Sequence, residues 1–275
     1  MKVYLSFDIE GVTGLTDNVK DIDPDGRFFH HAMELSTMDV NAAVEGAVEA
    51  GANEVIVNDG HGWNRRNLLF EKLHPQASLL RARVTTPGLN MAGLDESFHA
   101  VMFIGWHARA SSRGVLSHAL NSRAFTAWRI NDRPVGEPEL AAAYAGTYGI
   151  PLVLFTGDDA ACDEVQEWCP KCVRVQTKIV IDHVSAICGS KEKTFELIKN
   201  GARSALERRS DIEPFLFDGP FRVEADLVND HVAGAIAEIP AVSLVNRTTV
   251  RYESEDFRDI FRATHAMQMI SGAAL

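Results

Sequence analysis

The fold and the chemistry of this chain meet in one stretch, Lys2-Val3-Tyr4-Leu5-Ser6-Phe7-Asp8-Ile9-Glu10-Gly11. In its first six residues the polarity of the side chains alternates and strand formers are frequent. We therefore expect a strand at 2–7, with Asp8 and Glu10 on one face of its end. Two carboxylates held this close repel each other unless a cation neutralises them, and divalent metal ions accept carboxylate oxygen readily. The alternative is a polar strand end in which one acid caps the next turn.

Histidines follow two further apolar strands of the sequence. The strand expected at 54–57 runs into Asn58-Asp59-Gly60-His61-Gly62, and the strand expected at 99–104 runs into Gly105-Trp106-His107-Ala108. Open α/β sheets place their ligand crevice beyond the carboxyl ends of the strands. A single histidine is usually structural, but two at equivalent strand ends beside a carboxylate pair indicate a common site.

Two later segments add further polar groups. Val115-Leu116-Ser117-His118 supplies a third histidine, and Ile130-Asn131-Asp132-Arg133-Pro134-Val135-Gly136-Glu137 ends on a carboxylate that opens an apolar helix. Glu137 therefore projects from a first helical turn.

These motifs together resemble the DppA-type D-aminopeptidases, a family of binuclear zinc peptidases. The resemblance rests on Ser6 to Gly11, on Asn58 to His61, on Gly105-Trp106-His107-Ala108-Arg109-Ala110, on Ser117-His118 and on Asn131 to Glu137, in the family's order, and it fades after about residue 160. It implies that the metal ligands are Asp8, Glu10, His61, His107 and Glu137, and that His118 is the catalytic nucleophile. It also implies a homo-oligomer, a decameric ring whose internal channel limits substrate size.

Five ligands, three of them carboxylates, are too many for one tetrahedral zinc ion and suit two metals that share a carboxylate. We expect Asp8 to bridge the ions, with Glu10 and His61 on one and His107 and Glu137 on the other. Mixed imidazole and carboxylate ligands favour Zn²⁺, with Mn²⁺ or Co²⁺ as replacements.

The role of His118 departs from the one that the resemblance implies. A nucleophilic imidazole would form an acyl intermediate, which is unnecessary when two metal ions activate a water. We favour His118 as a general acid and base or as a donor to the developing oxyanion. The alternative is a histidine that orients a metal ligand.

Composition restricts the class of protein. The chain has 275 residues, of which 46% are hydrophobic and 24% charged, which is typical of a globular enzyme. The net charge of -11 argues against a nucleic-acid partner, because phosphate binding needs a basic surface. The sequence has no run of eighteen apolar residues, and its amino end passes directly into a predicted strand, so we expect a cytoplasmic protein without a membrane span.

The four cysteines include the motif Cys169-Pro170-Lys171-Cys172. A redox pair usually opens a helix after a strand, whereas this motif closes a predicted helix. A four-thiolate zinc site needs a second close pair, and Cys162 and Cys188 stand alone. We therefore expect reduced thiols, with a redox or zinc role as the alternative.

Several other polar residues have a simpler interpretation than catalysis. Asp158 and Asp159 are expected to cap the helix at 160–168 rather than to meet a substrate amine. Asn58 and Asp59 are expected to orient His61 or to cap the following turn. We expect solvated side chains for the two arginines of the motifs and assign no role to the histidines outside them; these residues are Arg109, Arg133, His30, His31, His74, His99, His183, His231 and His265.

The pattern of elements predicts an α/β fold: a layered sheet domain at residues 1–165 with its ligand crevice at the strand carboxyl ends, and a smaller α+β domain at 166–275. In the first part we expect strands at 2–7, 54–57, 78–83, 99–104, 124–130 and 151–156 and helices at 28–50, 67–73, 138–148 and 160–168. In the second part we expect strands at 173–181, 220–227 and 241–251 and helices at 190–208, 230–237 and 255–271.

The resulting functional hypothesis is a binuclear zinc aminopeptidase that hydrolyses the N-terminal residue of short peptides or aminoacyl amides. The resemblance implies a D-amino acid, while the residues themselves leave D and L open. The alternatives are a general metal-dependent amidase, a two-metal phosphoesterase, and a peptide- or metal-binding module without turnover. The motifs contain no Lys/Arg cluster of the kind that favours a phosphoesterase.

Overall fold

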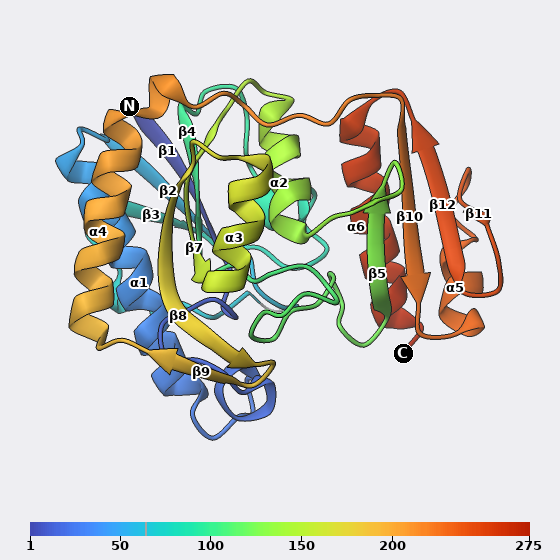
Figure 1. The fold of residues 1–275 in the computed structure, drawn as a ribbon, viewed down its shortest axis with the longest axis horizontal. Coiled ribbons are helices and arrows are strands. Elements are labelled where there is room, and N and C mark those ends of the chain that lie inside the picture. The colour runs from blue at the N-terminus through green and yellow to red at the C-terminus, as the bar shows by residue number, and fades with distance from the viewer. Residues whose placement is uncertain (64) are drawn as a thin grey trace.

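A computed structural model describes residues 1–63 and 65–275, which form two sheets with helices packed against them (Figure 1). Seven strands form the larger sheet, in the order β3 (Ala77–Leu80), β2 (Glu54–Asp59), β1 (Lys2–Phe7), β4 (Ala100–Ile104), β7 (Leu152–Asp158), β8 (Val173–Asp182) and β9 (Ser185–Cys188). All neighbours pair in parallel except β8 and β9, which form an antiparallel hairpin. The layered α/β architecture expected from the apolar strands is confirmed.

Helices cover both faces of this sheet, as parallel strands require. Figure 1 shows α1 (Phe29–Glu49) and α4 (Lys191–Glu207) on one face and α2 (Glu137–Gly146) and α3 (Asp159–Trp168) on the other. Helices α1 and α4 approach closely at Gly46, where an added Cβ would lie 2.1 Å from the carbonyl oxygen of Lys199. The side chain of Lys199 forms ion pairs with Glu45 and Glu49 of α1.

The smaller sheet is antiparallel and has the order β11 (Ser243–Leu244), β12 (Thr249–Ser254), β10 (Phe221–Leu227), β5 (Phe125–Ile130) and β6 (Arg133–Pro134). Helices α5 (Asp230–Ile236) and α6 (Phe257–Ala273) pack against it, and α6 also contacts α2 of the larger unit. Short helical turns lie at Asn18–Ile22, Phe70–Lys72, Leu89–Met91 and Arg209–Asp211.

Three details differ from the sequence-based expectation. The strand and helix expected at 173–181 and 190–208 are β8 and α4, which belong to the larger sheet rather than to the smaller unit, while β5 and β6 belong to the second sheet. The boundary between the two sheets therefore does not lie at residue 165. The sequence did not predict this, because the hydrophobic alternation of a strand does not reveal which strand it pairs with. The segment 241–251 is the β11–β12 hairpin instead of one strand, and the helix at 67–73 is only the short turn at 70–72.

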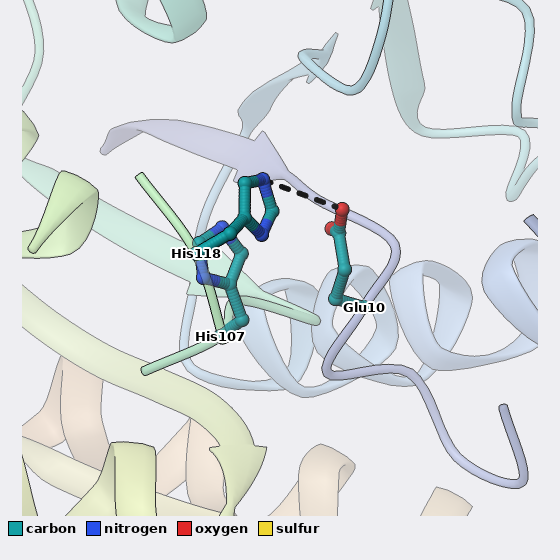
Figure 2. Close-up of side chains that lie close together, drawn as sticks. All are labelled: Glu10, His107 and His118. Atoms are coloured by element: carbon teal, nitrogen blue, oxygen red, sulfur yellow. Dashed lines mark ion pairs between the residues drawn. The ribbon is translucent and has the colours of Figure 1, made fainter. Parts of the chain in front are cut away.

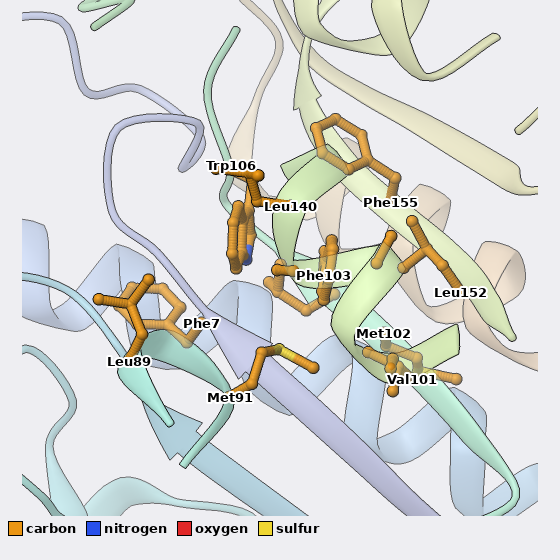
Figure 3. Close-up of a cluster of buried hydrophobic side chains, with 14 of the residues drawn as sticks. Phe7, Leu89, Met91, Val101, Met102, Phe103, Trp106, Leu140, Leu152 and Phe155 are labelled. Carbon is orange, nitrogen blue, oxygen red and sulfur yellow. The ribbon is translucent and has the colours of Figure 1, made fainter. Parts of the chain in front are cut away.

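The core beneath the strand ends combines aromatic and aliphatic side chains (Figure 3). The rings of Phe103 and Trp106 stack with centroids 4.4 Å apart, and the Trp106 indole donates a hydrogen bond to the carbonyl oxygen of Ser6. This contact ties the end of β4 to the end of β1. Within the described part of the chain, no helix is both long and apolar enough to cross a membrane.

Candidate metal centre

The structure brings together all six residues predicted for the site. Asp8 and Glu10 follow β1, His61 follows β2 and His107 follows β4, and these three strands are neighbours in the sheet. Glu137 is the first residue of α2, and the loop before β5 carries His118. Because parallel strands end at the same edge of a sheet, side chains from distant parts of the sequence meet there.

Two glycines allow the loops that carry the predicted ligands to approach each other. Gly105 has φ of +75°, and a Cβ at this position would lie 2.3 Å from the carbonyl oxygen of Asp8. A Cβ on Gly11 would lie 2.2 Å from the carbonyl oxygen of Trp106. The Gly11 amide instead donates a hydrogen bond of 2.7 Å to the carbonyl oxygen of Gly105. Only glycine at both positions permits this approach of the β1 and β4 loops.

Asp8 lies between two histidines. Its Oδ1 is 2.9 Å from Nδ1 of His61, and its Oδ2 is 3.6 Å from Nε2 of His107. Oε2 of Glu10 is 3.3 Å from the same His61 nitrogen. Asp8, Glu10 and His61 thus form one group of ligand atoms close enough together to hold a single ion.

A second group surrounds His107. Its Nε2 lies 3.3 Å from Oε1 of Glu137, and its ring stacks on that of His118 with centroids 4.0 Å apart. Nε2 of His118 is 3.9 Å from Oε1 of Glu10, the ion pair drawn in Figure 2, and 3.8 Å from Oε1 of Glu137. Glu10, His107 and His118 also satisfy the spacing of a metal-binding group, so the geometry suits His118 as well as Glu137 around this position.

Hydrogen bonds to carbonyl oxygens fix the orientation of two imidazoles. Nδ1 of His107 donates to the carbonyl oxygen of Ala108 at 2.8 Å, and Nδ1 of His118 donates to that of Leu116 at 2.9 Å. A carbonyl oxygen only accepts, so each Nδ1 carries the proton and each Nε2 presents its lone pair to the carboxylates when the ring is neutral. This arrangement is typical of histidines that bind metals.

The electrostatics of the site favour positive charge. Burial and the neighbouring Glu10 raise the pKa of Asp8 to about 7. Burial alone would lower the pKa of His107, but Glu137, Glu10 and Asp8 outweigh it and raise this pKa to about 10; the carboxylates likewise raise the pKa of His61. For His118, burial and the adjacent His107 lower the pKa, which favours its neutral form.

Two unpartnered polar atoms support the fit of a metal. Oε2 of Glu10 and Nε2 of His107 are buried and have no hydrogen-bond partner among the described residues. Each lies 3.3 Å from an ion-pair neighbour, Nδ1 of His61 and Oε1 of Glu137 respectively. A buried polar atom that forms no hydrogen bond is costly, and a divalent cation would satisfy both. Nitrogen and oxygen donors of this kind suit zinc.

A buried lysine that the sequence did not reveal supports the Glu10 loop. Lys178 of β8 is 2% exposed, and its ammonium group donates hydrogen bonds to the carbonyl oxygens of Glu10, at 2.6 Å, and of Leu15. The neighbouring Thr177 hydroxyl donates to the carbonyl oxygen of Gly11. We infer that β8 holds the loop that carries Glu10. The strand pattern did not signal this role, because Lys178 reads as an exposed position in an alternating strand.

The capping prediction for Asp158 is confirmed, since its Oδ1 accepts a hydrogen bond from the amide of Ala161. Its Oδ2 also accepts from the amide of Val115, which steadies the loop that leads to His118. Asp59 accepts hydrogen bonds from the backbone and side-chain amides of Asn67, and among the described residues no hydrogen bond joins it to the ring of His61.

The two motif arginines are paired rather than simply solvated: Arg109 forms an ion pair with Glu164, and Arg133 with Glu139. The cysteines are free thiols, buried at Cys162, Cys169 and Cys172 and exposed at Cys188. The CxxC motif follows the end of α3, as expected.

Asp8, Glu10, His61, His118 and Glu137 of the predicted site line a cavity of about 520 Å³. Its wall also includes six residues that carry no signal of a site in the sequence: Asn18, Trp63, Arg65, Asn121, His183 and Gln268. They come from the β1 and β2 loops, the segment before β5, the β8–β9 hairpin and α6, so only the tertiary fold brings them together.

Comparison with known proteins identifies the family of this chain. The model of the D-aminopeptidase family, peptidase family M55, matches residues 1–266. A D-aminopeptidase from Bacillus subtilis is 33% identical over 270 residues, covering 97% of this chain and 96% of the relative. The solved structure of the Zn-dependent D-aminopeptidase DppA from Bacillus subtilis, a self-compartmentalizing protease, has a TM-score of 0.92 and 32% identity, covering 100% of this chain and 98% of that chain. The chain belongs to the D-aminopeptidase family of peptidases.

Proposed function

We propose that this protein is a zinc-dependent aminopeptidase that uses two metal ions to remove the N-terminal residue of short peptides. One observation carries the proposal: the two oxygens of Asp8 face different histidines, His61 and His107, so one carboxylate can bridge two ions. Family membership supports the peptidase over the phosphoesterase and over a binding module.

The proposed ligands divide between the two positions. Glu10 and His61 would complete one ion, His107 and Glu137 would complete the other, and Asp8 would contact both. When bound, the ions would polarise the scissile carbonyl and lower the pKa of a water molecule. The relative of known structure is described as Zn-dependent, which supports zinc; Mn²⁺ and Co²⁺ suit the same ligands.

His118 has the properties of a proton carrier in this proposal. Its neutral form is favoured, and its Nδ1 proton is held by the carbonyl oxygen of Leu116, so Nε2 is free to accept a proton from water. The same nitrogen can then deliver that proton to the leaving amine. This role needs no acyl intermediate on the imidazole.

The proposed substrate is a short peptide with a free amino terminus, and the names of the relatives support a D configuration of the residue removed. The free amine would lie beside the metal centre, where it could bind one of the ions in its neutral form or donate a hydrogen bond to a carboxylate oxygen of the ligands. Blocking the amine should then remove a charge-assisted contact worth roughly 1.5–3 kcal/mol.

We therefore expect D-alanyl di- and tripeptides to be hydrolysed while their N-acetylated forms and folded proteins are not. The measurement is a competition between equal amounts of free and N-acetylated D-alanyl-D-alanine, followed by mass spectrometry. The corresponding L-alanyl peptides in a parallel reaction report the preferred configuration. Equal cleavage of the free and acetylated peptides would replace the aminopeptidase with a general amidase.

We further propose that the chain assembles into a homo-oligomer, in the form of a decameric ring. The relative of known structure is described as self-compartmentalizing, which requires several copies around an enclosed space. The β8–β9 hairpin carries four exposed aliphatic side chains, Ile179, Ile181, Val184 and Ile187. Solvent exposure of such a cluster is unfavourable, and burial against another copy would remove it from water.

A further inference from the structure

The cavity beside the proposed metal centre contains a buried cation without a partner anion. Arg65 is 2% exposed and lines the cavity wall. Nη1 donates a hydrogen bond of 2.7 Å to the carbonyl oxygen of Leu89, whereas Nε has no hydrogen-bond partner among the described residues. Within the same part of the chain, no carboxylate forms an ion pair with this guanidinium. A buried charge is costly unless it is paired.

The two carboxylates whose charge acts on Arg65, Asp59 and Asp8, are already engaged by other groups. Asp59 accepts three hydrogen bonds, from the backbone and side-chain amides of Asn67 and from the amide of Leu68. Asp8 faces the imidazoles of His61 and His107. Burial lowers the pKa of the Arg65 guanidinium, and the attraction of Asp59 and Asp8 offsets only part of that shift. The cavity wall therefore retains a site for an additional anion.

This cation shares a cavity with the proposed metal centre. Arg65 lines the same cavity as Asp8, the proposed bridging ligand, and as Glu137. In a dipeptide the carboxylate is attached to the α-carbon of the leaving amine, a few ångströms from the scissile carbonyl. A planar guanidinium is well suited to bind such a carboxylate through charge-assisted hydrogen bonds.

We propose that Arg65 binds the free α-carboxylate of the peptide substrate and thereby favours dipeptides that end in a carboxylate over those with a blocked carboxyl terminus. This inference rests on the proposed aminopeptidase function and names the class of substrate within it. Arg65 would act as a specificity residue, because it would contact the carboxyl-terminal end of the substrate and not the atoms of the scissile bond.

The test compares three substrates: D-alanyl-D-alanine, its C-terminal amide, and D-alaninamide, which lacks a second residue. For the wild-type enzyme we expect kcat/KM for the free dipeptide to exceed that for the dipeptide amide by about 10- to 100-fold, mainly through KM. Arg65→Met should lose this preference while hydrolysing D-alaninamide at nearly the wild-type rate. Arg65→Lys should retain a smaller preference, because it keeps the charge but not the planar fork.

Arg262→Met is the matched control, since it removes an exposed arginine of α6. It should leave the preference for the free carboxylate unchanged. Equal kcat/KM for the dipeptide and its amide in the wild-type enzyme would overturn the proposal. A proportional loss on all three substrates in both Arg65 variants would also overturn it, because Arg65 would then be a structural residue.

A binding measurement separates this inference from the proposed function. Calorimetry with a reduced dipeptide, in which the scissile carbonyl is replaced by CH₂, requires no turnover. We expect the analogue with a free carboxylate to bind the wild-type holoenzyme more tightly than its amide, and Arg65→Met to abolish the difference. If the enzyme hydrolyses no peptide but still binds the free carboxylate analogue more tightly than its amide, the peptidase function is rejected and the carboxylate site is retained. If both analogues bind the wild-type protein equally, the carboxylate site is rejected.

Discussion

Replacing Asp8 with alanine is expected to release both metal ions and to lower peptidase activity by roughly 10³-fold or more. Asp8 is the one carboxylate whose two oxygens face different histidines, His61 and His107. Its removal would deprive both proposed ions of a ligand. Each ion would then keep a single carboxylate to offset its charge, Glu10 for one ion and Glu137 for the other. Replacing a residue that binds only one ion should lower the metal content and the peptidase activity less.

The measurement is elemental analysis of the purified variant together with kcat/KM for D-alanyl-D-alanine. Asp163→Ala provides the control, because Asp163 is an exposed aspartate on α3. It should keep wild-type metal content and activity. Full metal content in Asp8→Ala would show that Asp8 is not a ligand, and loss of one ion alone would assign it to a single site.

Replacing His118 with alanine is expected to leave both metal ions in place and to lower kcat by roughly 10²–10⁴-fold, the usual contribution of a general acid and base. The neutral imidazole of His118 presents Nε2 near Glu10 and Glu137 without the short contacts that Asp8 makes to His61. Loss of the proton carrier should therefore slow proton transfer without emptying the centre.

Metal analysis of this variant distinguishes the two roles that the geometry allows. A loss of metal would make His118 a ligand, consistent with its place beside Glu10 and His107. An acyl adduct trapped on the wild-type His118 and identified by mass spectrometry would establish the nucleophile instead. His30→Ala, at an exposed position of α1, should change neither metal content nor kcat.

The sequence predicted the layered sheet because local signals and tertiary structure agree there. The apolar runs of β1, β4 and β7 are buried on both faces, and the polar residues that follow β1, β2 and β4 mark the edge where the site lies. The partner of β8 was not predictable, because pairing with β7 depends on the connection through α3 and not on the pattern of the strand itself. The turn between β11 and β12 was missed for lack of glycine or proline at 241–251.

The candidate site was likewise predictable only in part from the sequence. Asp8, Glu10, His61 and His107 lie directly beyond strand ends, where spacing along the chain is informative. Arg65 and Lys178 carry no such signal. A buried arginine or lysine is indistinguishable by sequence from a solvated one, because its burial is decided by segments distant along the chain.

The central claim is that two zinc ions act together in one centre, and a metal titration tests it most directly. Protein stripped with a chelator is titrated with Zn²⁺ while bound metal and hydrolysis of D-alanyl-D-alanine are measured on the same samples. The account predicts that activity rises until about two equivalents per chain are bound and that elemental analysis of the active enzyme gives the same number. Full activity with only one bound ion per chain would contradict it.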